Sequence, residues 1–414
     1  MNTQTWSPSG CHVMAKPTGS KCNIDCSYCF YLEKEKLYPE RGQDWMMGDE
    51  TLSAYILQHI EAQSGNEVVF AWQGGEPTLR GLAFFEQAVR LQHEYARGKK
   101  VINTFQTNGI LIDEKWCAFF NQHNFLIGIS IDGPAELHDI YRRTRSGKAT
   151  HHKVETAILL LKQYKVEFNT LTVVSRANVD HALSVYRYLK GLGSSHMQFI
   201  PLVERKASKA TASGLTLINP ESKIAGQLCD WSVDAKAYGQ FMSQIFHHWV
   251  RHDIGQVFVQ LFENTFALVC GQPAQICVFA PQCGSAFALE ANGDLYSCDH
   301  YVYPEYKLGN IHESTIAEMN RSDANRRFGA AKSDSLCEDC RRCECRPLCH
   351  GGCPKHRFAI SASGKPDLNY LCPGYKAFFH YASPYLAMMK KLYLHNYPPA
   401  AIMQIIQKKE SQQQ

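Results

Sequence analysis

The chain of 414 residues lacks the segments that would take it into or across a membrane. It has no run of 18 apolar residues, and no basic stretch followed by an apolar one at its N-terminus, so we expect neither a transmembrane helix nor a secretory signal. The 43 basic residues against 39 acidic ones leave a net charge of only +4, which does not indicate a nucleic acid or a membrane surface as partner. No internal repeat and no Gly-x-Gly-x-x-Gly motif is present. We therefore expect a cytoplasmic protein.

Cysteine is what the chain has in excess. It holds 17 cysteines, an odd number that cannot all pair within one chain, and eleven of them lie between Cys270 and Cys372. In a reducing compartment, clustered cysteines more often bind metal or do redox chemistry than form disulfides. The cysteines therefore predict metal sites, concentrated toward the C-terminus.

The first half of the chain alternates between two periodicities. Six short segments rich in β-branched or aromatic residues predict strands: His12–Lys16, Glu67–Trp72, Lys100–Gln106, Phe125–Ile131, Val166–Val174 and His196–Pro201. Five segments with apolar residues on one helical face predict helices between them: Asp49–Gln63, Gly81–Arg97, Asp113–His123, His152–Tyr164 and Val179–Leu192. This order predicts an α/β fold with a parallel sheet, a partial barrel of about six units, because the alternation stops near Pro201.

Changes in composition predict the domain organisation. We expect the partial barrel over 1–230, with an exposed loop over 204–223, and a helical linker over 231–271 with a helix at Val233–Arg251. A cysteine-rich domain is expected over 272–385. A C-terminal helix and a polar tail should fill 386–414, with the final QKKESQQQ disordered.

The first cysteine motif follows the first predicted strand. Cys22, Cys26 and Cys29 form C-x₃-C-x₂-C, followed by Phe30 and Tyr31. Three thiolates leave one iron of a four-iron cluster without a protein ligand, and an open iron can bind another molecule. A CxxC pair alone equally fits a zinc knuckle or a buried pair, whereas the complete motif in this position favours the cluster.

Three polar segments follow the next three predicted strands. They are QGGEP at Gln73–Pro77, QTNG at Gln106–Gly109 and SIDGP at Ser130–Pro134. Each alone is equally a plain turn. The carboxyl ends of parallel strands meet at one edge of a barrel, so the four segments together predict one site.

In these residues the sequence resembles the radical S-adenosylmethionine enzymes. There the open iron of a [4Fe-4S] cluster binds S-adenosylmethionine, and its reductive cleavage releases a 5′-deoxyadenosyl radical that takes a hydrogen from the substrate. The resemblance implies Cys22, Cys26 and Cys29 as the ligands of that cluster. It also implies these residues as contacts of S-adenosylmethionine: Tyr31, Gln73, Gly74, Gly75, Glu76, Gln106, Asn108, Ser130 and Asp132.

The C-terminal cysteines have enough thiols for two further four-ligand sites. Structural zinc also takes four cysteines with CxxC spacing, so zinc stays open on spacing alone. The pattern resembles the SPASM-type extension of radical S-adenosylmethionine enzymes, which carries two auxiliary clusters. That resemblance implies one [4Fe-4S] cluster on Cys277, Cys283, Cys298 and Cys353, and another on Cys340, Cys343, Cys349 and Cys372.

Six cysteines remain outside these sets: Cys11, Cys117, Cys229, Cys270, Cys337 and Cys345. Cys117 lies on a predicted helix and is expected to be a small buried residue. Cys337 and Cys345 crowd the second auxiliary set, and either is an alternative ligand there.

Within the SPASM group the sequence resembles anaerobic sulfatase-maturating enzymes from about Ala15 to Tyr375, in segments such as CNIDCSYCFYLEK, FAWQGGEPTLRGLAFFE, GDLYSCDHYVYPEYKLGNI and CHGGCPKHRF. That family oxidises a Cys or Ser of a sulfatase precursor to Cα-formylglycine. The resemblance implies hydrogen abstraction from Cβ, Asp299 as the base, and an electron donor such as flavodoxin or ferredoxin. Asp299 equally fits a turn cap beside a cluster.

The alternative is a SPASM-type maturase that forms a crosslink or thioether in another ribosomal peptide. Such enzymes often carry an N-terminal leader-binding domain of about 80 residues, and the cluster motif here begins at Cys22, which favours the sulfatase branch.

Overall fold

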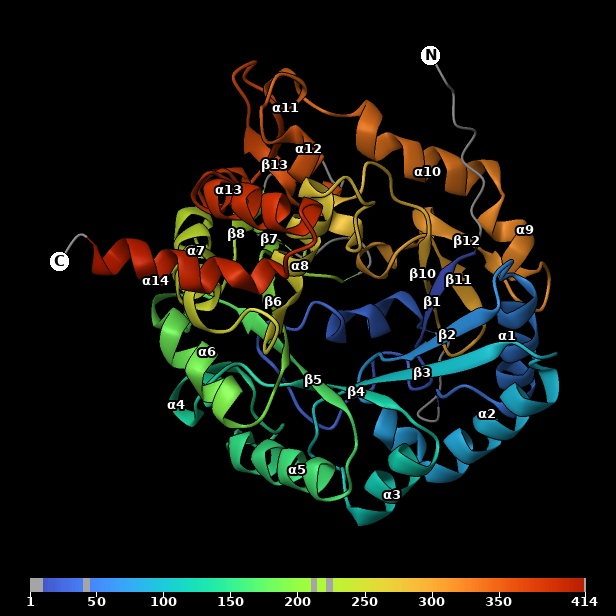
Figure 1. The fold of residues 1–414 in the computed structure, drawn as a ribbon. Helices are drawn as coiled ribbons and strands as arrows, with labels where there is room; N and C mark the ends of the chain where they lie inside the picture. The colour runs from blue at the N-terminus through green and yellow to red at the C-terminus, as the bar shows by residue number, and fades with distance from the viewer. Residues whose placement is uncertain (1–9, 40–44, 210–213, 221–225, 413–414) are drawn as a thin grey trace.

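The computed structural model describes residues 10–39, 45–209, 214–220 and 226–412. Its framework is a ten-stranded sheet in the order β12-β11-β10-β1-β2-β3-β4-β5-β6-β9 (Figure 1). The six central strands are β1 (His12–Ala15), β2 (Glu67–Trp72), β3 (Lys100–Thr107), β4 (Leu126–Ser130), β5 (Phe168–Val174) and β6 (His196–Pro201). All five pairings among these six strands are parallel, which confirms the predicted partial barrel.

Helices connect the parallel strands and cover the outside of the sheet (Figure 1). They are α1 (Asp49–Glu61), α2 (Leu82–Tyr95), α3 (Glu114–Gln122), α4 (Ala135–Tyr141), α5 (His151–Gln163) and α6 (Ala182–Gly191). Each predicted helix is present within three residues of its expected ends, because the apolar stripe that predicts it is the face that packs on the strands. On α2, for example, Phe84, Phe85 and Ala88 are buried against Trp72 and its neighbours.

The sheet extends beyond the six predicted strands at both edges. β10 (Ala286–Leu289), which comes from the cysteine-rich region, pairs in parallel with β1, and β11 (Asp294–Tyr296) and β12 (Lys307–Asn310) continue the sheet in antiparallel order. At the other edge β9 (Phe258–Val259) pairs with β6. The sequence did not indicate these short strands, and through them the two halves of the chain share one sheet.

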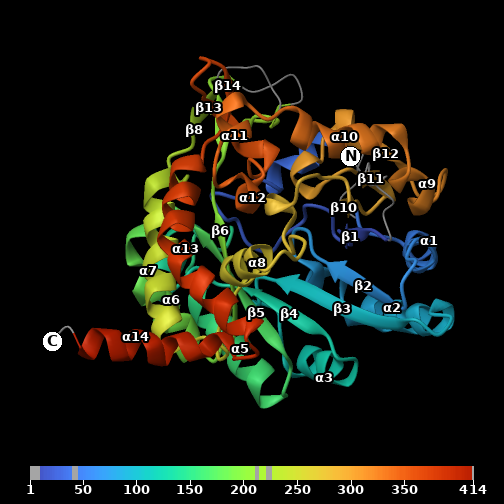
Figure 2. The same ribbon diagram turned by 45° about the horizontal axis from the view of Figure 1, so that its top comes forward.

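Two long helices fix the start of the last cysteine segment. α7 (Ala235–His252) packs along α13 (Cys372–Leu394), as Figure 2 shows. A Cβ atom added at Gly374 would lie 1.9 Å from the carbonyl oxygen of Ala235, and one added at Gly239 would lie 2.4 Å from that of Gly374. Only glycine allows the backbones to approach so closely, and this contact positions Cys372 at the first turn of α13.

The remaining elements are short. The cysteine-rich region contains α8 (Gln260–Val269), α9 (Ile316–Asn320), α10 (Asp323–Asp334), α11 (Glu338–Arg341), α12 (Arg346–Cys349), β13 (Arg357–Ile360) and β14 (Pro366–Asn369). Short 3-10 turns complete the chain at Leu32–Leu37, Pro77–Arg80, Val179–His181, Cys277–Phe279, Asp299–Tyr301, Pro304–Tyr306, Pro354–His356 and Pro399–Ala401. Within the described residues, no helix has the length and apolar character needed to span a membrane.

Two local predictions need correction. The segment 204–223, expected as a loop, includes β7 (Arg205–Ala207), which pairs with β8 (Gly226–Leu228), and buries Leu215, Leu217 and Ile218; residues 210–213 and 221–223 lie outside the described part. The predicted disorder of the tail is wrong up to Ser411. α14 (Ile402–Ser411) is held there because Ile402 and Ile406 are buried on its inner face, whereas residues 413–414 lie outside the described part.

Candidate active site

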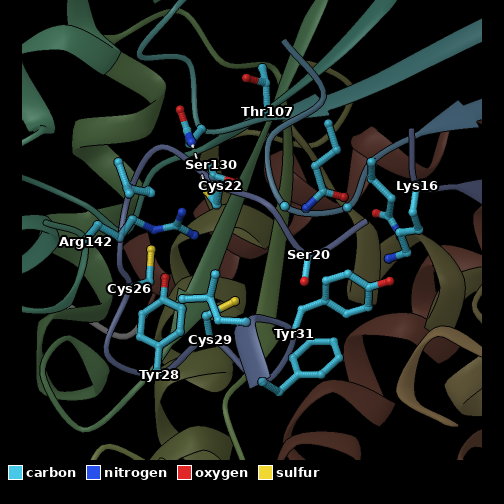
Figure 3. A pocket seen from close by; sticks show the side chains of 18 of the residues that line it. Lys16, Ser20, Cys22, Cys26, Tyr28, Cys29, Tyr31, Thr107, Ser130 and Arg142 are labelled. Atoms are coloured by element: carbon cyan, nitrogen blue, oxygen red, sulfur yellow. Dashed lines mark hydrogen bonds between the residues drawn. The ribbon is translucent and has the colours of Figure 1, made fainter. Parts of the chain in front are cut away.

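A cavity of about 810 Å³ lies at the carboxyl ends of β1 to β4. The cavity contains all three cysteines of the N-terminal motif (Figure 3). Seven further predicted site residues line it as well: Tyr31, Gln73, Gly74, Gly75, Gln106, Asn108 and Ser130, together with Asp299 from the cysteine-rich region.

The loop that carries Cys22, Cys26 and Cys29 is held by the segment after α4. The amide of Asp25 donates to the carbonyl of Arg143 (2.9 Å) and the amide of Ser27 to that of Tyr141 (3.2 Å). The three thiols are close enough to influence one another electrostatically, and burial raises the pKa of Cys22 to about 12. The loop therefore presents three thiols to one space.

The two glycines of the QGGEP segment allow close backbone packing in the cavity wall. A Cβ atom at Gly75 would lie 2.0 Å from the carbonyl oxygen of Lys21, and the amide of Gly75 donates to the carbonyl of Gly19 (2.8 Å). Gly74 has φ +134°, a conformation that favours glycine. The segment after β2 thus lies directly against the start of the cluster loop.

Glu76 points into the protein. Its carboxylate accepts hydrogen bonds from the Thr78 hydroxyl (2.7 Å), the Thr107 hydroxyl (2.8 Å) and the Asn108 amide (2.8 Å), and the side chain is fully buried. It does not line the cavity. Burial raises the pKa of Glu76 and these hydrogen bonds lower it, with a net increase. Its observed role is to link the ends of β2 and β3, and the expected contact with a cofactor stays a prediction.

Asp132 also stands behind the cavity wall. It accepts from the Tyr28 hydroxyl (2.6 Å), the Arg142 guanidinium (2.8 Å) and the Val173 amide (2.9 Å). Arg142 and Tyr28, in contrast, line the cavity beside Cys26 (Figure 3). Asp132 therefore orients a buried cation that faces the cysteines.

Asp299 reaches the cavity from the far end of the chain and forms an ion pair with Lys16, the residue after β1. The Lys16 ammonium also lies 4.2 Å from the centroid of the Tyr31 ring, and the Tyr31 hydroxyl donates to Glu290. Burial would raise the pKa of Asp299, but Lys16 and then His300 hold it below its ordinary value. Asp299 thus stands as a carboxylate whose side chain is 17 % exposed.

Eight lining residues carried no site role in the sequence prediction, and five of them are polar: Lys16, Ser20, Tyr28, Thr107 and Arg142. Lys16 directly follows β1 and Thr107 ends β3, so the rule that sites form at the carboxyl ends of parallel strands would have indicated both. The carboxylate partner of Arg142 is Asp132.

The C-terminal cysteines form two further groups. The thiols of Cys277, Cys283, Cys298 and Cys353 are electrostatic neighbours, as are those of Cys340, Cys343, Cys349 and Cys372. The second group lines a cavity of about 660 Å³. Cys345 lines the same cavity beside Cys343, and Cys337 contacts Cys340. The geometry brings together the sets implied by the resemblance and keeps both alternatives adjacent to the second.

The other four cysteines lie apart. Cys11, Cys117 and Cys229 are buried and Cys270 is half-buried. Within the described part of the chain, no group of three or more His, Cys, Asp or Glu side chains has the arrangement of a single-ion site.

Comparison with known proteins decides the family. Residues 17–189 match the radical SAM superfamily, and residues 277–344 match an iron–sulfur cluster-binding domain. A serine-type anaerobic sulfatase-maturating enzyme of Bacteroides thetaiotaomicron is 42% identical over 408 residues, which cover 98% of each chain. A cysteine-type relative from Clostridium perfringens (strain ATCC 13124) is 35% identical over 384 residues, 90% of this chain and 96% of its own. The chain belongs to the anaerobic sulfatase-maturating enzymes.

Solved structures agree with this family. The structure of "native anSMEcpe with bound AdoMet and Cp18Cys peptide" matches with a TM-score of 0.78 and 33% identity over 92% of this chain and 98% of that one. Streptococcus suis SuiB bound to the precursor peptide SuiA shares the fold at a TM-score of 0.58 and 12% identity, over 87% and 75% of the two chains. The chain is accordingly a radical SAM oxidoreductase.

Its cofactors are S-adenosylmethionine, the [4Fe-4S] cluster of the radical SAM domain and the auxiliary iron–sulfur clusters of the SPASM domain. The residues present fit this assignment. Thiolate is the usual protein ligand of such clusters, and each of the three groups brings three or four thiols close together. The iron–sulfur match also decides between iron–sulfur and structural zinc.

Proposed function

We propose that this enzyme oxidises a Ser or Cys side chain of a sulfatase precursor to Cα-formylglycine in the cavity at the carboxyl ends of β1 to β4. The single observation that carries this proposal is that Asp299 and the three motif cysteines line the same cavity, although 270 residues separate Cys29 from Asp299. A base and the radical-generating site therefore face the same bound side chain.

The ligand sets follow from the cysteine groups. Cys22, Cys26 and Cys29 would hold the cluster that binds S-adenosylmethionine. Cys277, Cys283, Cys298 and Cys353 would hold the first auxiliary cluster, and Cys340, Cys343, Cys349 and Cys372 the second. All eleven cysteines are then cluster ligands, and none of them is assigned to a disulfide.

S-adenosylmethionine would occupy the strand-end part of the cavity. The backbone of Gly74 and Gly75 and the side chains of Gln73, Gln106, Asn108 and Ser130 supply its polar wall, and Arg142 offers a cation for a carboxylate. Glu76 and Asp132 support that wall from behind. When bound, the cluster and S-adenosylmethionine supply a 5′-deoxyadenosyl radical.

Asp299 would take the proton from the substrate hydroxyl or thiol. Removal of a hydrogen atom from Cβ leaves a carbon that becomes a better electron donor once its oxygen or sulfur is deprotonated. Loss of the proton to Asp299 and of one electron, which the auxiliary iron–sulfur clusters would accept, then yields the aldehyde from Ser, or a thioaldehyde that water converts to the aldehyde and hydrogen sulfide from Cys. Lys16 holds Asp299 ionised and oriented, and Tyr31 stacks beside Lys16 at the cavity wall.

The higher identity to the serine-type relative favours Ser as the substrate residue. The enzyme would act on the precursor in the cytoplasm, with a flavodoxin or ferredoxin as electron donor.

Anaerobic incubation with matched peptides tests this function. Peptides that contain Ser-x-Pro-x-Arg or Cys-x-Pro-x-Arg are incubated with the enzyme, S-adenosylmethionine and dithionite, and their masses are then measured by mass spectrometry. Loss of two hydrogens from the Ser peptide supports the proposal. Deoxyadenosine without any change in either peptide contradicts it and points to a maturase of another ribosomal peptide. Asp299→Asn should abolish the aldehyde and leave deoxyadenosine formation, with Asp25→Asn, an exposed acid outside the cavity, as control.

A further inference from the structure

The segment that holds the cluster loop carries a group of exposed cations. Between the end of α4 and the start of α5, the chain turns back on itself in an antiparallel bridge from Arg143 to Ala149. Arg143, Arg145 and Lys148 are exposed on this turn, and none of them has an ion-pair partner among the described residues. We name this group the basic turn.

The basic turn touches the cluster loop directly. Arg145 donates to the carbonyl of Cys22 (3.1 Å), and Thr144 forms an antiparallel bridge with Ile24. Within the loop, Asp25 and Ser27 are exposed, so the segment between Cys22 and Cys29 itself reaches the surface. The exposed cations therefore lie directly beside the loop that carries the three motif cysteines.

Three exposed basic residues lie on this turn. Asp25 is the acidic residue of the loop, and Asp139 is engaged by the amides of Thr150 and His151 (2.7 and 3.0 Å). A chain with a net charge of only +4 has no general excess of cations to explain such a cluster. Unpaired exposed cations steer an acidic partner to a defined orientation more than they stabilise a fold.

We propose that the basic turn is the docking surface for a small acidic electron-carrier protein of the flavodoxin type. This inference rests on the proposed function, because only a reductively started reaction needs such a carrier. One electron passes in each encounter: the carrier is oxidised by one electron and the enzyme's iron–sulfur site gains it. The enzyme would recognise this carrier by its negatively charged surface, which would face Arg143, Arg145 and Lys148.

Binding measurements on the holoenzyme test the surface without any turnover. The dissociation constant for oxidised flavodoxin is measured for wild type and for the double variant R143E/K148E, in which Arg145 stays in place because it supports the cluster loop. Near 10 mM salt, where the Debye length is about 30 Å, the double variant should bind about tenfold more weakly; at 150 mM, where it is about 8 Å, the difference should shrink. The matched control R90E/K115E places the same charge change on α2 and α3, which lie away from α4 in Figure 1, and should bind as wild type does.

Equal binding by R143E/K148E and wild type would overturn the proposal, as would an equal loss in the control. If R143E/K148E loses iron, the neutral double variant R143Q/K148Q takes its place. We expect it to bind flavodoxin a few fold more weakly than wild type, and unchanged binding would overturn the inference. Deoxyadenosine formation adds a second readout: with flavodoxin as reductant it should fall in the double variant, and with dithionite it should not. Failure of the wild type to convert either peptide with dithionite would refute the proposed function and leave the binding result to judge the surface separately.

Discussion

The ammonium group of Lys16 forms an ion pair with the carboxylate of Asp299, 283 residues further along the chain. Lys16 follows the first strand of the barrel, and Asp299 follows the cysteine Cys298 of the SPASM domain. Their contact is possible because β10 pairs in parallel with β1 and brings the two chain segments to the same edge of the sheet. The ion pair thereby joins the two domains at the cavity.

Lys16→Met should weaken both the fold and the reaction. The substitution leaves the Asp299 carboxylate largely buried without its cation, and removal of one partner of a buried pair costs about 3–5 kcal/mol. We expect a lower melting temperature in differential scanning fluorimetry and a peptide-oxidation rate reduced at least about tenfold. Lys36→Met is the control, since its pair with Glu33 is more exposed, and a melting temperature equal in both variants would contradict the structural role of Lys16.

Glu76→Gln should loosen the wall of the cavity. Glutamine turns one acceptor oxygen into a donor, which then faces the donors of Thr78, Thr107 or Asn108 and costs about 1–3 kcal/mol. The free energy of unfolding should fall by that amount, and S-adenosylmethionine should bind more weakly in calorimetry. Glu86→Gln, on the exposed face of α2, should change neither quantity. Wild-type stability of the Glu76 variant would argue that the carboxylate is a cofactor contact only.

The parallel core of the barrel could be predicted from the sequence because its signal is local. A strand such as Glu67–Trp72 and a helix such as Asp49–Glu61 each show their own periodicity, and parallel order follows from their alternation. β10 has four residues and β9 has two, too few to show any period, and both are strands only because an existing edge accepts them.

The site was predictable in position and less so in orientation. The motifs placed Gln73, Asn108 and Ser130 at the cavity, since parallel strands end together. A motif does not say which way a side chain turns, so the sequence did not show that Glu76 and Asp132 lie behind the cavity wall, and their contact with a cofactor stays a prediction. The ion pair between Lys16 and Asp299 was missed because the two residues lie at a sequence separation that no local pattern reveals.

Gly374→Ala should disturb the second auxiliary group of cysteines. The new Cβ would meet the carbonyl of Ala235, and forcing the backbones of α7 and α13 apart costs about 1–3 kcal/mol or more. Because Cys372 begins α13, the iron content of the purified protein should fall together with its melting temperature. Gly191→Ala, where a Cβ meets nothing within 4 Å, is the control. Unchanged iron content and stability would contradict the close helix contact.

Single cysteine substitutions should separate ligands from neighbours at the second auxiliary site. Cys349→Ala removes a member of the central group, and we expect it to lose about four irons per chain. Cys345→Ala should retain them, because Cys345 is outside the proposed ligand set and its thiol lies beside that of Cys343. Iron and sulfide counting after anaerobic purification gives the answer. If Cys345→Ala loses iron and Cys343→Ala does not, the ligand set includes Cys345 in place of Cys343.

The stability of the protein should depend on pH through His59, which is fully buried on α1. Its Nε2 donates to the carbonyl of Val69 (3.0 Å) and its Nδ1 accepts from Gln63 (3.3 Å), so the neutral ring satisfies both contacts. Burial lowers the pKa of His59 from 6.5 to about 4. The unfolded chain therefore binds a proton below pH 6.5 that the folded chain does not bind until about pH 4, and the stability present above pH 6.5 is lost as the pH falls. The slope should be about 1.4 kcal/mol per pH unit between these values.

Urea unfolding at a series of pH values measures this slope. His59→Gln should remove this part of the pH dependence, whereas the exposed His152→Gln should keep it. Equal slopes in both variants would mean that the pKa of His59 is the same in the folded and unfolded states.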